Sequence, residues 1–272
     1  MAEDKETVPC YDMAGTIITA PGGSQFQSGD EVYARTDYFR TGTAREYTVA
    51  PAKELALRPK RFNWAESATV PMSATTAWQA LFVRAGLKPE AGVGAKGNRI
   101  LVTAASGGVG TWVVQLAKWA GAEVVATCGS ESIESVKAIG ASEVIDYKTT
   151  DVKAWATSDE SRKVDLVIDC IGRKSLGDAW WVVKEGGTLI SIVQPPEQVR
   201  PVKLEAKNIK NLFFVMDANG KQLAEVTKLI EGGGFVSRLD SVFSLEKFEE
   251  ALAKLESGKT KGKIVLDMGV SN

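Results

Sequence analysis

The sequence predicts an α/β protein in which a doubly wound parallel sheet is joined to a smaller β domain. Six short apolar runs lie between residues 98 and 216, and most of them are separated by segments with helical periodicity. A glycine-rich turn connects the first run to the helix after it, and a turn-rich, strand-like stretch precedes them all. Runs that are apolar throughout are typical of strands buried on both faces, as in a parallel sheet covered by helices.

The N-terminal part predicts a small β unit followed by two helices. Three β-type runs, GTII (15–18), DEVYAR (30–35) and AREYTVA (44–50), are separated by glycine, proline and serine. From residue 59 to 87 the apolar spacing becomes helical, with Pro71 between two helices. We expect Asn63 to cap the first helix and Ser73 or Thr75 to cap the second.

The middle and the tail supply the remaining elements. The six predicted strands of the sheet are 98–105, 123–128, 143–147, 164–172, 187–193 and 211–216, with helices at 109–120, 132–140 and 175–187. The tail reads as a helix (222–233), a strand near 240–243, a helix between Ser244 and Gly258, and a strand (262–268). We therefore predict a domain over 1–86, completed by 240–272, and a second domain over 87–239.

The composition indicates a globular protein without a nucleic-acid or membrane surface. The chain has 272 residues, a formal net charge of −1 and an acidic, polar beginning unlike a secretory signal or a mitochondrial presequence. No apolar run is long enough to span a bilayer. The three cysteines, Cys10, Cys128 and Cys170, are scattered, which favours a reducing compartment, and we predict a cytoplasmic location.

The absence of histidine limits the chemistry. A catalytic zinc usually takes histidine among its ligands, and three scattered cysteines cannot form a structural zinc site, so no metal is expected. Nucleophile systems that use histidine as the base are excluded as well. Any proton transfer must therefore use tyrosine, lysine, a carboxylate or water.

The turn between residues 101 and 110, LVTAASGGVG, predicts a dinucleotide site. Ala104, Gly107 and Gly110 form A-x-x-G-x-x-G, and Gly108 adds another glycine. Small residues allow a tight turn out of a strand and let a pyrophosphate approach the free N–H groups of a helix N-terminus. The order strand, turn, helix, strand supports this interpretation. The alternative is a tight turn without a ligand.

The end of the second strand leaves the choice of dinucleotide open. It reads TCGSES (127–132), where Glu131 could hold a ribose hydroxyl or point to water. A 2′-phosphate would instead prefer Ser130 and nearby cations. Lys259, Lys261 and Lys263 form a basic run near the C-terminus, which could equally be a solvated loop.

Together, these stretches resemble the medium-chain dehydrogenase/reductase superfamily, in its zinc-independent quinone oxidoreductase-like and enoyl reductase branch. The resemblance rests on GDEVYA (29–34), TAREYTV (43–49), ATVPMSATTAWQAL (68–81), residues 102–128, GASEVIDYKTTD (140–151), DLVIDCIG (165–172), GGTLISI (186–192) and the tail to GKTKGKIVL (258–266). It implies a Rossmann domain and a smaller GroES-like β domain.

The resemblance also implies roles for individual residues. Thr76 would lie at the mouth of the cofactor cleft, and the pyrophosphate turn would comprise Ser106, Gly107, Gly108 and Val109. The adenosine ribose-phosphate corner, commonly an NADPH site in this branch, would contain Ser130 and Tyr147. The nicotinamide end would contain Cys170, Ile171, Phe214 and Val215, and Lys263 would lie near the phosphates. Tyr147, Ile171, Phe214 and Val215 could instead be core residues.

Two departures from the branch stand out. Many relatives carry lysine or arginine near position 131, where this chain has Glu131. Relatives also begin with several strands before the segment that here starts at residues 7–15, where Asp12 is the surviving acid. We therefore expect a truncated GroES-like domain, arising from a shortened chain or a reduced domain, and such a domain would leave strand edges unpaired.

The expected function is hydride transfer from NADPH, with NADH possible, to an α,β-unsaturated carbonyl or a quinone. Tyr33, Tyr38 and Tyr47 are candidate proton donors, although each could be a structural tyrosine. The alternative is a non-redox descendant of the reductase fold, acting as a cyclase-type scaffold or as a partner subunit of a biosynthetic enzyme. The run 211–216 could form a sheet edge that pairs in a homodimer.

Overall fold

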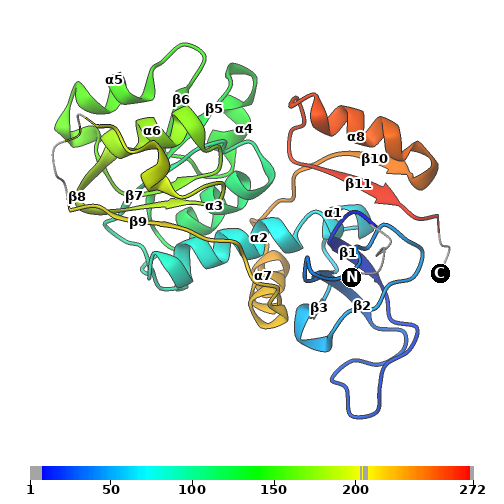
Figure 1. Cartoon of the computed structure of the whole chain (residues 1–272). Coiled ribbons are helices and arrows are strands. Elements are labelled where there is room, and N and C mark those ends of the chain that lie inside the picture. Colours follow the sequence, from blue (N-terminus) through cyan, green and yellow to red (C-terminus); the bar gives the residue numbers. More distant parts are fainter. Residues whose placement is uncertain (1–7, 203, 205–207, 270–272) are drawn as a thin grey trace, which may run out of the picture. The chain divides into compact units, whose positions relative to one another are not determined.

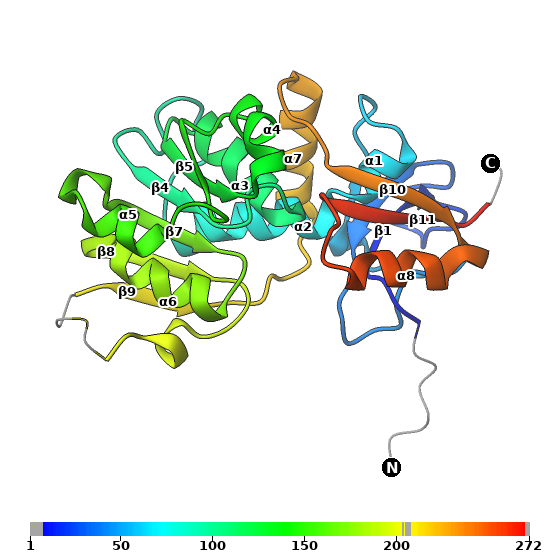
Figure 2. The same cartoon turned by 90° about the horizontal axis from the view of Figure 1, so that it is seen from above.

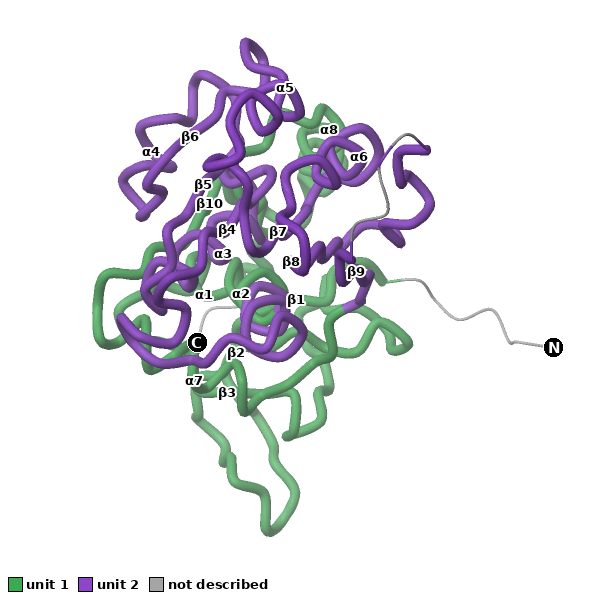
Figure 3. Tube along the Cα trace, turned by 90° about the vertical axis from the view of Figure 1, so that its left-hand side faces the viewer, with its two compact units in different colours: residues 1–75, 216–272 green, residues 76–215 purple. Residues whose placement is uncertain are grey.

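The chain folds into two compact units. The computed structural model describes residues 8–202, 204 and 208–269. One unit comprises residues 1–75 and 216–272, and the other comprises residues 76–215 (Figure 3). We refer to them as unit 1 and unit 2.

Unit 2 is built on a six-stranded parallel sheet with the order β6-β5-β4-β7-β8-β9. The strands are β4 (Arg99–Val102), β5 (Glu123–Cys128), β6 (Glu143–Asp146), β7 (Val164–Asp169), β8 (Val183–Ser191) and β9 (Lys210–Phe213). From β4 the chain winds outward to β5 and β6, then returns to place β7 on the other side of β4. This confirms the doubly wound parallel sheet, and β9 forms one edge of it.

Helices cover both faces of this sheet (Figures 1 and 2). They are α3 (Gly108–Trp119), α4 (Ile133–Ala138), α5 (Val152–Thr157) and α6 (Arg173–Val182). Helix α3 buries the apolar stripe that the sequence predicts, with Trp112, Val113 and Leu116 at most 1% exposed. On the α6 side, Leu176 and Trp180 pack against Leu101, Val167 and Leu189 of the strands.

Unit 1 contains two small sheets. Strands β1 (Asp12–Thr16), β2 (Glu31–Arg35) and β3 (Leu55–Leu57) form an antiparallel sheet, and β10 (Leu239–Ser244) pairs in parallel with β11 (Lys263–Asp267). The helices of this unit are α1 (Trp64–Ala68), α7 (Gly220–Gly232) and α8 (Phe248–Glu256). A small core of Val32, Ala34 and Leu55 lies on the β1–β3 sheet, and β1 is an edge strand of that sheet among the described residues.

The unit boundaries differ from the domains that the sequence predicts. Unit 2 begins inside α2 (Pro71–Trp78), and α7 belongs to unit 1, whereas the prediction placed residues 87–239 together. The reason is the packing of α7 on β3: a Cβ added to Gly220 would lie 2.2 Å from the carbonyl oxygen of Leu55. Such a close approach of two backbones is invisible in the local sequence.

Some predicted element boundaries are wrong for local reasons. The second helix begins at Pro71 itself, where proline's fixed φ suits a first helical position, and continues as a π-helical segment, Gln79–Arg84. The helix predicted over 175–187 ends at Val182, because β8 already begins at Val183. AREYTVA forms no strand: among the described residues, only 42–44 bond the backbone of a distant segment, as when Ala44 N–H donates to the Pro9 carbonyl at 3.1 Å, and Arg45 N–H donates locally to the Thr43 carbonyl.

Candidate cofactor site

The winding of the sheet creates one point where neighbouring loops diverge. Strand β4 lies between β5 and β7, and the helices that follow β4 and β7 cover opposite faces of the sheet. In open α/β sheets, ligands bind in the crevice outside the carboxyl ends of the strands at this switch point. By this rule the crevice would be bordered here by residues 103–107, after β4, and residues 170–172, after β7.

The turn after β4 has the geometry that the glycine motif predicts. Ala104 adopts a left-handed φ of 50°, and Gly107 N–H donates to the Ala104 carbonyl at 2.9 Å. A Cβ on Gly110 would lie 2.2 Å from the same carbonyl oxygen, so the motif needs glycine there. The α3 helix therefore starts directly against the turn.

The first turn of α3 leaves donors for an anion. Thr111 makes the first helical bond, to the Gly107 carbonyl at 3.1 Å, and no side chain of the described residues caps the helix. The N–H groups of Gly108, Val109 and Gly110 precede that bond. With Ser106 half-buried beside them, these residues form a cradle that suits a pyrophosphate on the positive end of a helix dipole.

A buried carboxylate, which the sequence reading missed, joins the loops of the crevice. Asp169 ends β7 with 0% exposure and accepts from the hydroxyls of Thr103 at 3.0 Å, Ser191 at 3.2 Å and Ser175 at 3.2 Å. It also accepts from Gly172 N–H at 2.8 Å. The sequence contained one indication of this cluster, because Thr103, Asp169 and Ser191 each end or follow an apolar run.

The residues predicted for the nicotinamide end lie on two neighbouring segments. Cys170 is half-buried and Ile171 is 50% exposed, directly after β7. Phe214 is buried and Val215 is 53% exposed; Phe214 N–H donates to the Ser191 carbonyl at 3.3 Å, and Arg84 lies over its ring. Burial, with a smaller contribution from Asp169, raises the pKa of the Cys170 thiol, so this thiol stays protonated at neutral pH.

The predicted adenosine corner is exposed and internally paired. Ser130 Oγ bonds the Asp146 carboxylate at 2.5 Å, and Lys148 Nζ pairs with Glu131 at 2.8 Å. The bond to Glu131 is the main cause that raises the pKa of Lys148. Tyr147, between these groups, is 58% exposed, which is unlike a core residue. Lys148 is thus a cation at this corner that the sequence reading did not single out.

The other predicted residues lie elsewhere. Thr76 is buried in α2, with 5% exposure. Lys263 lies in unit 1, where its Nζ pairs with Asp12 at 2.9 Å, and that carboxylate raises the pKa of Lys263. Asp12 also accepts from Met72 N–H at 2.8 Å.

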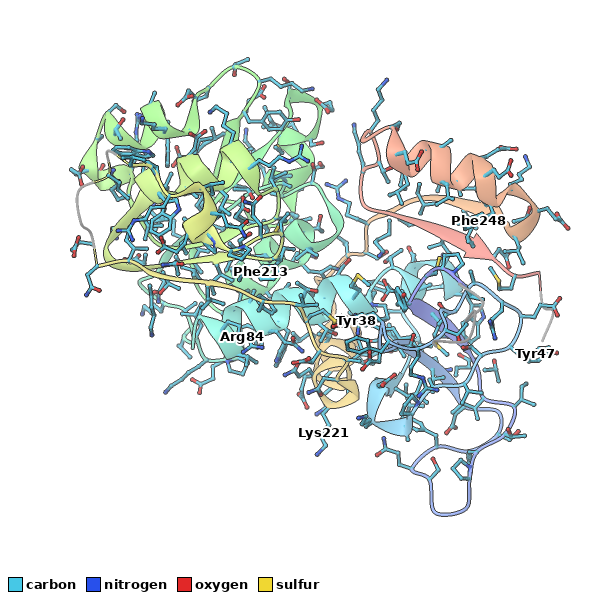
Figure 4. The ribbon with its side chains drawn as sticks, viewed as in Figure 1. Tyr38, Tyr47, Arg84, Phe213, Lys221 and Phe248 are labelled. Atoms are coloured by element: carbon cyan, nitrogen blue, oxygen red, sulfur yellow. The ribbon has the colours of Figure 1, made fainter. Side chains whose placement is uncertain are left out.

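The three predicted tyrosines differ in access. Tyr33 is fully buried in unit 1, and its hydroxyl bonds Thr227 Oγ1 at 2.7 Å and the Leu223 carbonyl at 3.2 Å, both on α7. Burial raises the pKa of Tyr33, and because its enclosed hydroxyl bonds α7, we propose a structural role for this tyrosine. Tyr38 and Tyr47, labelled in Figure 4, are 47% and 65% exposed.

Comparisons with known proteins identify the family. The family described as "Zinc-binding dehydrogenase" matches residues 139–266. A probable zinc-binding oxidoreductase, mitochondrial, from Arthroderma benhamiae is 51% identical over 96% of this chain and 80% of that protein. This chain belongs to the medium-chain dehydrogenase/reductase superfamily. It is an oxidoreductase with the quinone oxidoreductase-like sequence pattern described above.

Two further comparisons support the same family, one in sequence and one in fold. A chloroplast envelope quinone oxidoreductase homolog from Arabidopsis thaliana is 37% identical, covering 96% of this chain and 79% of its own length. The crystal structure of an NAD-dependent alcohol dehydrogenase superposes with a TM-score of 0.84 at 27% identity, over 97% of this chain and 83% of that one.

The residues of this chain do not fit the zinc that the family description names. The sequence contains no histidine and three cysteines. Within the described residues, no group of three or more cysteine, aspartate or glutamate side chains could hold a metal ion. Zinc bound by protein needs three or four such ligands around one point, so no step of the chemistry is assigned to it.

Proposed function

We propose that this chain is an NADPH-dependent reductase that transfers hydride to an α,β-unsaturated carbonyl or a quinone. The observation that carries the proposal is the cradle formed by the glycine turn and the first turn of α3 at the switch point of the sheet. Its requirement for glycine at position 110 holds the N-terminus of α3 directly against the turn, where a phosphate group would meet the free N–H groups. The names of relatives, which include quinone oxidoreductases and NAD(P)H oxidoreductases, support the reaction class.

Two features of the adenosine corner bear on the choice between NADPH and NADH. Ser130 and Lys148 could both contact a 2′-phosphate, which favours NADPH. Glu131 and Asp146 place two carboxylates at the same corner, and a ribose diol would suit them better, which makes NADH the second candidate. We propose NADPH because the exposed Glu131–Lys148 pair is weak and can open toward a phosphate.

The nicotinamide, when bound, supplies the hydride. In the reduction of an enone, hydride adds to the β-carbon and a proton adds to the α-carbon of the enolate. This chain's share is to orient the cofactor through residues 104–110 and 170–172. Tyr38 and Tyr47 stay candidates for the proton, with water as the alternative, because Tyr33 lacks access.

The test is to measure the oxidation of NADPH and NADH in the presence of a panel of enones and quinones. The loss of reduced-nicotinamide absorbance reports this oxidation. A saturated ketone of matched size is the control for each enone. Turnover with an enone or quinone supports the proposal, and binding of either dinucleotide without turnover of any member would refute it. Quenching of fluorescence from the seven tryptophans reports binding independently, and failure to bind either dinucleotide would favour the non-redox alternative.

Two further proposals concern assembly and location. The edge strand β9, with Phe213 37% exposed (labelled in Figure 4), supports a homodimer formed by pairing of this edge, and light scattering at working concentration would test it.

Among the described residues no helix is long and apolar enough to cross a membrane. Because the names of several relatives place them in mitochondria or chloroplasts, the cytoplasmic location stays a prediction that imaging of a tagged chain would test.

A further inference from the structure

The Asp169 carboxylate is buried without a positive partner. Its side chain lies at the carboxyl end of a central strand, and in the part of the chain that the structure describes no lysine or arginine is paired with it. A buried carboxylate is costly unless hydrogen bonds compensate for the lost hydration. Four donors do so here: the Thr103 and Ser175 hydroxyls on Oδ1, and Gly172 N–H and the Ser191 hydroxyl on Oδ2.

Two of the hydroxyls that donate to Asp169 also accept hydrogen bonds from the backbone of neighbouring loops. Thr103 Oγ1 accepts from Cys170 N–H at 2.8 Å, so its own proton is free to go to Asp169. Ser191 Oγ accepts from Val193 N–H at 3.2 Å and lies 3.4 Å from Gln194 N–H, and its proton also goes to Asp169. The Gln194 side chain in turn accepts from Arg173 N–H at 3.0 Å.

These bonds have a fixed direction because the backbone groups can only donate. Gly172 N–H needs an acceptor at the position of Oδ2. An asparagine at position 169 would therefore keep its carbonyl oxygen there and place its NH₂ where Oδ1 now lies. That NH₂ would face the hydroxyls of Thr103 and Ser175. Thr103 already accepts from Cys170 N–H, so its proton would lose its acceptor. A carboxylate satisfies every member of the network, whereas an amide does not.

We infer that Asp169 is a positioning residue for the cofactor, which fixes the loops after β4, β7 and β8 in one arrangement. This inference rests on the proposed function, because it assigns Asp169 to the pyrophosphate and nicotinamide part of that same site. Residues 103–107 and 170–172 border the crevice, and 191–194 follow the next strand. At the adenosine corner, 129–131 and 146–148, Ser130 bonds Asp146 and Glu131 bonds Lys148, so its side chains hold one another.

The experiment compares Asp169→Asn with Asp165→Asn. Asp165 is a matched control on the same strand at its other end, where it accepts from Arg99 N–H at 2.8 Å and pairs with Lys184 at 2.9 Å. Amide hydrogen exchange of the free protein is the first readout. We expect faster exchange over 103–110 and 170–173 in Asp169→Asn, with 129–148 unchanged, and no such change in Asp165→Asn.

Cofactor affinity is the second readout. We expect Asp169→Asn to raise the dissociation constant of the preferred reduced dinucleotide about tenfold or more, because buried donors lose their acceptor. The adenosine fragment of that dinucleotide, which is adenosine 2′-phosphate for NADPH and adenosine for NADH, should bind within about twofold of wild type. Asp169→Glu, which keeps the charge, is the second variant if the amide does not fold, and we expect partial recovery of affinity relative to Asp169→Asn.

Several results would overturn the inference. Equal loss for the dinucleotide and its fragment, or equal effects of Asp165→Asn and Asp169→Asn, would mean that Asp169 only stabilises the fold. Unchanged exchange at 170–173 would show that the carboxylate does not hold that loop. If wild type binds neither dinucleotide, the proposed function has failed, whereas the exchange result still reports on the network.

Discussion

The sharpest test of the cofactor cradle is Gly110→Ala. The added Cβ would lie 2.2 Å from the Ala104 carbonyl oxygen and 2.8 Å from both the Ala104 carbonyl carbon and Ala105 Cα. All three atoms are backbone, so no side chain can rotate away, and the turn or the start of α3 must move by about 1 Å to reach normal contact. Overpacking of this kind costs about 1–3 kcal/mol.

We expect two consequences of that movement. The melting temperature should fall by about 2–10 °C, given the usual scaling for a chain of this size. The dissociation constant for the dinucleotide should rise by about tenfold to a hundredfold, because the displaced N–H groups no longer converge on the phosphate. Differential scanning calorimetry and tryptophan quenching measure the two effects.

The matched control is the same substitution in α6. A Cβ on Gly177 would meet the Val199 carbonyl at 3.5 Å, an ordinary contact, so alanine should stabilise this helix by about 0.5–1 kcal/mol. Gly177→Ala should therefore raise the melting temperature and leave cofactor binding unchanged. A Gly110→Ala variant that keeps both wild-type stability and wild-type affinity would refute the close-approach argument.

Three other changes test individual assignments. Tyr33→Phe should lower stability by about 1–2 kcal/mol through loss of its bonds to α7, while kcat stays within twofold; a large loss of kcat would restore Tyr33 as a proton donor. Glu131→Gln should increase the affinity for NADPH about two- to fivefold by releasing Lys148, whereas the affinity for NADH, whose ribose diol suits the carboxylate, should not increase; weaker NADPH binding would contradict this. Asn63→Ala should cost about 1 kcal/mol in thermal unfolding, because the capping box with Glu66 is lost, and an unchanged melting temperature would show that α1 does not depend on it.

The sequence was informative where a local pattern decides the structure. The glycine turn, the buried stripe of α3 and the Asn63 cap follow from spacing and residue type alone, and the structure confirms each. The order of the apolar runs also indicated the doubly wound sheet. These features need only the few residues on either side of them.

What the sequence could not supply depended on partners far along the chain. The sequence alone could not separate Tyr33 from Tyr38 and Tyr47 as a candidate proton donor, because the helix that bonds its hydroxyl, α7, lies 190 residues later at Leu223. AREYTVA alternates like a strand, yet a strand needs a neighbour, and the described residues offer one only to 42–44. The polar ends of β4, β7 and β8 become a network only once the order of these strands is known.

The switch point also explains why side chains must join these loops. Helices α3 and α6 follow β4 and β7 on opposite faces of the sheet, so they cannot pack on each other to fix the two turns (Figure 2). Elsewhere in the sheet, consecutive helices on one face can do so. A group that reaches both turns must therefore lie in the plane of the sheet, at the end of a strand, where it is buried between the two helical layers. Asp169 has that position, and a carboxylate accepts several hydrogen bonds at once, so its burial and its four donors follow from the topology that creates the binding crevice.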